Sequence, residues 1–270
     1  MTTTQEPAVS FSNQRGQARV KLANPPVGET SVGFYFQRID GWNPVHQGAL
    51  WEKFRARYPE LEILPPLVDA PPQPRVALDF ASFLIRTCFV DKTKTQLVQI
   101  QDGLVLHNWR KMNDAREYQR YEATRSLLRE DWHDFQAYLR ERSFKSPAVI
   151  RCEMGYFNHL IRNEDWEDFS DLPKIFTVWR GVPQSSLGGK LQMASFAVSY
   201  RLEKGTVNIA VQPGVRSTDG KEILQFTLSS SVTPNSSDEQ ELFRCLDECH
   251  ENAARAFIEF TTEQARERWR

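Results

Sequence analysis

Cysteine, net charge and long apolar runs are all scarce in this sequence, and each scarcity excludes a class of protein. Four cysteines in 270 residues are too few for a disulfide framework. The 34 basic and 35 acidic residues nearly cancel, so no global field attracts nucleic acid or an anionic membrane. No segment approaches the roughly eighteen consecutive apolar residues of a membrane helix, and residues 1–7 lack the features of a secretory signal. We therefore expect a cytoplasmic protein with free thiols and no membrane contact.

Recognisable catalytic and cofactor motifs are also missing. The glycines of segment 181–190 have the wrong spacing for a phosphate loop, and a predicted strand follows them where a helix would be needed. Cys245, Cys249 and His250 lack the remaining ligands of a tetrahedral zinc site. The acidic cluster at 164–171 lacks the central glycine of a calcium loop. We therefore predict no cofactor and no metal site.

The sequence does contain one order of predicted elements that occurs twice. In each pass an early strand precedes apolar segments at hairpin spacing and then a long amphipathic helix, at 116–142 and again at 237–270. Helices that follow runs of strands are typical of antiparallel sheets covered on one face. We predict an α+β fold of two similar halves, each an antiparallel sheet ending in a long amphipathic helix. We expect residues 1–28 to form a mobile N-terminal arm, residues 29–145 the first half and residues 146–270 the second half.

The hairpin around Asp102-Gly103 is the clearest local signal, because this pair suits a turn that needs positive φ. It joins predicted strands at 97–101 and 104–109. A helix is predicted at 44–58, and further strands are predicted at 31–37, 82–90, 148–161, 191–202, 206–215 and 222–232.

The terminal helix has an N-terminal capping signal and no internal breaker. Ser236 or Ser237 is the expected N-cap, and neither glycine nor proline occurs from there to Arg270, so one unbroken helix is predicted. Segment 65–74 contains five prolines, which predict an extended connector.

Asn108, Trp109 and Arg110 are candidate ligand-binding residues at the end of a predicted strand. An amide, an indole N–H and a guanidinium there could converge on a planar or anionic ligand. In the structural alternative, Trp109 packs under the following helix and Arg110 pairs with a carboxylate such as Asp114 or Glu117.

Tyr156 and Asn158 are further candidates, on the first strand of the second half. Strand alternation places them on one face with Cys152 and Met154, and places His159 on the other. A core-facing asparagine must be hydrogen-bonded, so a bond from Asn158 to the backbone or to an arginine is the structural alternative.

These residues also resemble a known family. The shared motifs are Asn108-Trp109-Arg110, the helix-opening Tyr118 and Tyr121, the strand 156–161, and His250 with Phe257 in the terminal helix. They are similar to those of an uncharacterised, sporadically distributed prokaryotic protein family of comparable length. The resemblance implies a bacterial or archaeal intracellular protein and supplies no activity.

We expect a non-enzymatic protein-interaction scaffold, whose sheet face or long helices bind another protein or a second copy. One alternative is an enzyme with a cleft between the halves that uses Arg110 together with Tyr118, Tyr121 or Asn158. The other alternative is a nucleic-acid-binding protein that uses the terminal arginines Arg266, Arg268 and Arg270.

Overall fold

A computed structural model describes residues 22–67, 86–112, 118–180 and 189–270. Most of the predicted arm at 1–28 lies outside the described residues. So do most of the proline-rich segment 65–74, the start of the strand predicted at 82–90, and the first residues of the helix predicted at 116–142. Nine strands and five α-helices follow one another in the described part of the chain.

The first 145 residues contain β1 (Val27–Phe36), α1 (Pro44–Phe54), β2 (Glu60–Leu64), β3 (Arg86–Val90), β4 (Gln96–Gln101), β5 (Leu104–Arg110) and α2 (Tyr121–Glu141). The remainder contains β6 (Val149–Ile161), the short η1 (Phe169–Asp171) and α3 (Leu172–Ile175), then β7 (Phe196–Leu202), β8 (Gly205–Val215), β9 (Glu222–Val232), α4 (Glu239–Phe260) and α5 (Glu263–Arg268).

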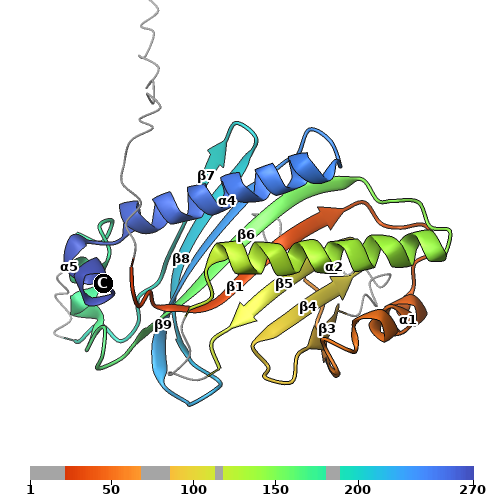
Figure 1. Cartoon of the computed structure of the whole chain (residues 1–270). Coiled ribbons are helices and arrows are strands. Elements are labelled where there is room, and N and C mark those ends of the chain that lie inside the picture. The colour runs from red at the N-terminus through yellow and green to blue at the C-terminus, as the bar shows by residue number, and fades with distance from the viewer. Residues whose placement is uncertain (1–21, 68–85, 113–117, 181–188) are drawn as a thin grey trace, which may run out of the picture.

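All nine strands form one antiparallel sheet in the order β2-β3-β4-β5-β1-β6-β9-β8-β7, so the fold is α+β as predicted. The strands of the two predicted halves share this one sheet, because β1 pairs with β5 on one side and with β6 on the other. Figure 1 shows the two long helices, α2 and α4, crossing the same face of this sheet. We use the name open face for the face that points away from α2 and α4, although several of its side chains on β3 and β4, including Cys88 and Leu97, are buried.

Strand alternation sends one set of side chains toward these helices. On β1, Val32, Phe34 and Phe36 are buried beneath them. The Phe34 ring lies 4.9 Å from the Trp132 ring of α2 and 5.7 Å from the Phe243 ring of α4, in edge-on geometry. A single side chain of the central strand therefore joins both helices in one hydrophobic core.

A buried carboxylate ties α2 to the strands and to the segment after α1. Asp131 is fully buried and lies 2.7 Å from the Nδ1 atom of His107 and 2.8 Å from a guanidinium nitrogen of Arg57. The Tyr58 hydroxyl donates to the same carboxylate at 3.2 Å. The pKa of Tyr58 is raised far above its usual value, first by burial and then by the Asp131 charge. His107 is thus part of a structural network.

The unbroken terminal helix predicted from Ser236 to Arg270 is wrong at both ends. Asp238 is the residue that precedes α4, whereas the Ser237 hydroxyl accepts the Val149 N–H. The helix stops at Phe260 because Thr261 is extended (φ −107°, ψ 144°) and bridges to Phe176, and Thr262 then caps α5. Two tertiary contacts compete with the helix there. They are the bridge between Thr261 and Phe176 and the hydrogen bond from the Thr262 N–H to the carbonyl of Ile175.

Other local predictions are confirmed or corrected by a few residues. The β4–β5 hairpin turns at Gly103, whose φ of +96° explains the glycine. The strand predicted at 191–202 begins later, at Phe196. Among the described residues, no helix is both long enough and apolar enough to cross a membrane.

Candidate binding surfaces

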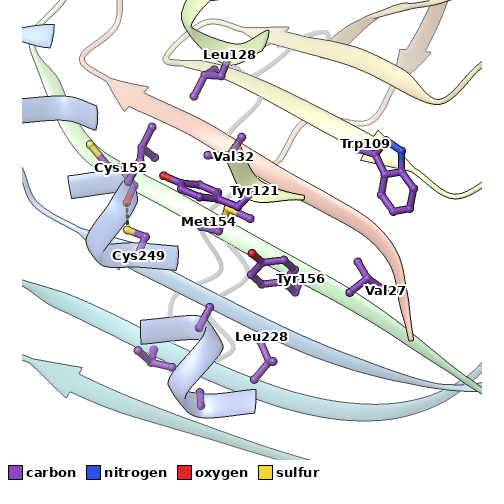
Figure 2. Close-up of a cluster of buried hydrophobic side chains, with 14 of the residues drawn as sticks. Val27, Val32, Trp109, Tyr121, Leu128, Cys152, Met154, Tyr156, Leu228 and Cys249 are labelled. Carbon is purple, nitrogen blue, oxygen red and sulfur yellow. Dashed lines mark hydrogen bonds between the residues drawn. The ribbon is translucent and has the colours of Figure 1, made fainter. Parts of the chain in front are cut away.

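Four of the candidate residues lie close together on the helix side of the sheet. The Trp109 and Tyr118 rings meet edge-on at 5.6 Å, and the Tyr121 ring stacks on His250 at 4.2 Å with 9° between the planes. The Tyr156 hydroxyl lies 2.7 Å from the Nδ1 atom of His250. Figure 2 shows Tyr156, Met154 and Cys152 following one another along β6, with Tyr121 and Trp109 nearby. Sequence candidates from both halves therefore meet at one junction.

Burial controls the chemistry of this junction. The pKa of Tyr156 is held well above its usual value, first by burial and then by the neighbouring Tyr118. The pKa of Tyr121 is also raised, first by burial and then by its bond to Asp247. Both phenols therefore stay protonated at physiological pH and serve as hydrogen-bonding groups.

A polar cleft of about 440 Å³ opens above this junction, between α2 and α4. Arg125 of α2 spans it, with its Nε atom 2.8 Å and its terminal nitrogen 3.1 Å from the two carboxylate oxygens of Asp247 on α4. The Tyr121 hydroxyl donates to the same carboxylate at 2.8 Å. Both oxygens are thus engaged, and this contact acts as a clamp between the helices.

Asn108 and Arg110 lie on the open face, so the predicted convergence of Asn108, Trp109 and Arg110 is wrong. Successive strand residues point to opposite faces, and Trp109 therefore points toward the helices. The Asn108 amide donates to Glu29 at 2.6 Å and accepts from Gln99 at 2.7 Å.

The partners of Arg110 are carboxylates of other strands. Among the described residues they are Glu29 of β1 at 3.7 Å and Glu62 of β2 at 3.4 Å. The predicted partners Asp114 and Glu117 lie outside the described residues. The pKa of Glu29 is raised because burial outweighs the opposing effects of Arg110 and Asn108. This ion-pair network places Arg110 away from the junction that contains Tyr118 and Tyr121.

Asn158 has the structural contact expected of a core asparagine. It lies on the helix side of β6, and its amide donates to the carbonyl of Phe226 at 2.9 Å. His159 points to the open face, where its ring lies against Gly28. An added Cβ at Gly28 would lie 2.2 Å from the Nδ1 atom of His159, so a larger residue there would require the His159 ring to move. Asn158 therefore belongs to the sheet pairing and not to the cleft.

The outermost strand, β7, presents an apolar surface that sequence reasoning did not single out. Val198 and Tyr200 point to the helix side, yet their side chains are 36% and 48% exposed. Leu191 and Met193, in the segment leading to β7, are 39% and 69% exposed. We call these four residues the β7 strip. The alternation of apolar residues in 196–202 was the available signal, but it fits a covered strand equally well.

The open face beside this strip has the opposite character. On β8 and β9, Thr206 and Ser231 pair through their hydroxyls at 3.0 Å, and Asn208 donates to Ser229 at 3.4 Å. Ser199 of β7 donates to Asn208 at 2.6 Å. This face is hydroxyl- and amide-rich, so the apolar exposure at this end of the sheet is confined to the helix side.

The terminal arginines make contacts within the chain. Arg266 bonds to the carbonyl of Ile258 at 2.7 Å, and Arg268 bonds to the carbonyl of Asp165 at 2.6 Å. The Trp269 indole donates to the carboxylate of Asp165 at 3.0 Å. The contacts of Arg268 and Trp269 anchor α5 to the loop after β6, and the contact of Arg266 anchors it to α4.

No protein-family model matches the chain, and a search of curated proteins finds no significant match.

Proposed function

We propose that this chain is a protein-interaction scaffold that uses the edge strand β7 as its docking element. The observation that carries the proposal is the β7 strip, which exposes Val198, Tyr200 and Met193 beside a strand that pairs on one side only, with β8, within the described sheet. An edge strand offers free backbone donors and acceptors to another strand, and natural proteins usually protect such edges. An exposed apolar edge is typical of a surface that a partner covers.

The arrangement of helices supports this proposal. We infer that residues 29–145 and 146–270 repeat one plan, since β1 and β6 lie side by side at the centre and the later strands of each half extend outward. In the first half, α1 packs against β3 and α2. In the described part of the connection between β6 and β7, the helices are the short η1 and α3, and α3 packs against α5. The outer strand of the second half thus lacks a helix equivalent to α1 within the described residues.

A cytoplasmic location fits this role. The four cysteines are buried free thiols, and burial raises the pKa of Cys88 to about 11. Unreactive thiols and the absence of a disulfide framework in the sequence are typical of proteins from a reducing compartment.

The proposal is tested by affinity capture from native extract with the wild type and two lysine variants. Val198→Lys places a charge in the β7 strip and should abolish capture of any partner that the wild type retains. Ile150→Lys, at a 50% exposed position on β6, is the matched control and should capture normally. Equal capture by the Val198→Lys variant would refute docking at β7.

An enzyme that uses the cleft between α2 and α4 is the second candidate. His250 favours it, because this ring lines the cleft and is oriented by the Tyr156 hydroxyl, and an oriented imidazole can act as a general acid or base toward a bound substrate. Arg110 and Asn158 are no longer part of this hypothesis. A small molecule whose binding raises the melting temperature of the wild type but not of a His250→Gln variant would support it, and no such molecule in a metabolite panel would count against it.

A further inference from the structure

We propose that the partner of β7 is β7 of a second copy, paired antiparallel about Ser199 in a twofold-symmetric dimer. This inference rests on the proposed function and names its partner. In such a dimer the sheets of the two copies join at their β7 edges into one continuous sheet, and both α4 helices lie on the same side of it.

The length and position of β7 define the register. A twofold axis in an antiparallel ladder passes between one residue and its own copy. Strand β7 runs from Phe196 to Leu202, so only an axis at Ser199 pairs the whole strand with itself. The outward-pointing backbone N–H and C=O groups of β7 have no strand partner in the described sheet. In this register each of them is hydrogen-bonded to the second copy.

The side chains are self-complementary in this register. On the helix side, Phe196 lies opposite Leu202 of the second copy, and Val198 lies opposite Tyr200. Aromatic and β-branched cross-strand pairs of this kind stabilise sheets. On the open face, Ser199 meets its own copy and Ala197 lies opposite Arg201, so no like charges are opposed.

The same contact covers Val198 and Tyr200 of the β7 strip. Within one copy, Tyr200 packs against Phe260 at the end of α4, with ring centroids 6.0 Å apart, and its side chain stays 48% exposed. In the dimer, Val198 and Tyr200 of each copy cover those of the other, between the two α4 helices. The dimer contact thus buries apolar side chains of β7 in the way that α1 buries side chains of β3 near the other edge of the sheet.

The other edge of the sheet is built against self-pairing. Strand β2 has Glu62 at its centre and Glu60 at its start, on the open face. A twofold axis at its midpoint would oppose Glu62 to its own copy, which is destabilising. Pairing of β2 with β7 would leave a free edge at each end and generate open chains of molecules instead of a closed dimer.

Single cysteines at exposed positions of β7 test the register. Residue 199 opposes itself, whereas the two copies of residue 197 lie four positions apart, or about 13 Å. A disulfide needs Cα atoms within about 7 Å. Mild oxidation should therefore cross-link Ser199→Cys into a covalent dimer in high yield, and Ala197→Cys alone should give little. An equal mixture of Ala197→Cys and Arg201→Cys should cross-link, because these two positions oppose each other.

The oligomeric state is measured by light scattering with size-exclusion chromatography on the full chain. A wild-type dimer, a Val198→Lys monomer and a dimeric Ile150→Lys control support the proposal. Ile63, on the other edge strand β2, is 72% exposed, so Ile63→Lys tests pairing through that edge. A monomer at every concentration, open polymers that Ile63→Lys abolishes, or equal cross-linking of the 197 and 199 cysteines would overturn the proposal. A monomeric wild type whose captured partner is lost with Val198→Lys would overturn this inference while leaving the proposed function intact.

Discussion

At the scale of single residues, Asp131 is the buried charge on which the core around α2 depends. Its carboxylate binds the guanidinium of Arg57, the ring of His107 and the hydroxyl of Tyr58. Removing one member of a buried ionic network leaves the others unpaired and costs about 3–5 kcal/mol. We expect Asp131→Ala to lower the free energy of unfolding by that amount in urea denaturation.

The control for this prediction is the adjacent Glu130. It lies 3.6 Å from Arg57, and its side chain is 62% exposed. Exposed ion pairs contribute at most about 1 kcal/mol, so Glu130→Ala should change stability little. Comparable losses in both variants would show that Asp131 has no special role.

Glu241 determines part of the pH dependence of stability. It accepts from Arg244 at 2.7 Å and from the Asn235 N–H at 3.0 Å, and these bonds lower its pKa from 4.5 to about 2. A depressed folded-state pKa adds stability that is present above pH 4.5 and is lost as the pH falls toward 2. Glu241→Gln should therefore lower the melting temperature at neutral pH, and the two curves should converge as the pH falls through this window.

A second glutamate on the same arginine provides the comparison. Glu248 lies 3.1 Å from Arg244 and has a more exposed side chain, at 40% against 17%. Glu248→Gln should have a smaller effect at neutral pH. A pH-independent difference between the Glu241→Gln variant and the wild type would contradict the assignment.

At the scale of elements, two glycines show how context decides the effect of one methyl group. A Cβ on Gly33 of β1 would lie 2.2 Å from the carbonyl oxygen of Val105, so the neighbouring strand β5 must move. Gly48 of α1 is exposed, and a Cβ there would have no neighbour within 4 Å. Gly33→Ala should destabilise by about 1–3 kcal/mol. Gly48→Ala should stabilise by up to about 1 kcal/mol in the same urea measurement, because alanine favours the helix. Effects of the same sign in the two variants would contradict this steric explanation.

Elements were predictable where local chemistry decides them. Gly103 identifies the β4–β5 hairpin because its turn needs a positive φ. The end of α4 was not predictable, since Thr261 and Thr262 are acceptable within a helix and leave it only to contact Phe176 and Ile175. The competing contacts come from residues more than eighty positions away, and no local pattern encodes them.

At the scale of the whole molecule, the central pairing of β1 with β6 joins the two halves in one sheet. Phe34 contacts both long helices, so its loss disrupts the core of each half. We expect Phe34→Ala to cost about 3–5 kcal/mol. Tryptophan fluorescence and far-UV circular dichroism should report one shared urea midpoint in both wild type and variant. Separate midpoints would indicate halves that unfold independently.

The candidate site was only partly predictable from sequence. Alternation correctly placed Tyr156 and Asn158 on one face and His159 on the other. Alternation also places Trp109 on the face opposite to Asn108 and Arg110, so these three side chains cannot converge on one ligand. The meeting of Tyr121 with His250 depends on how α2 and α4 lie across the sheet, and that geometry has no local signature.

The amino-acid sequence by itself determined the α+β class, the hairpins and the two long amphipathic helices, because periodicity and turn chemistry act over a few residues. Only the tertiary structure decided that the nine described strands share one sheet, that Asn108 and Arg110 face away from the tyrosines, and that the edge strand β7 has exposed apolar side chains. These features arise from pairings between distant segments, whose free energy depends on which surfaces meet in the folded chain.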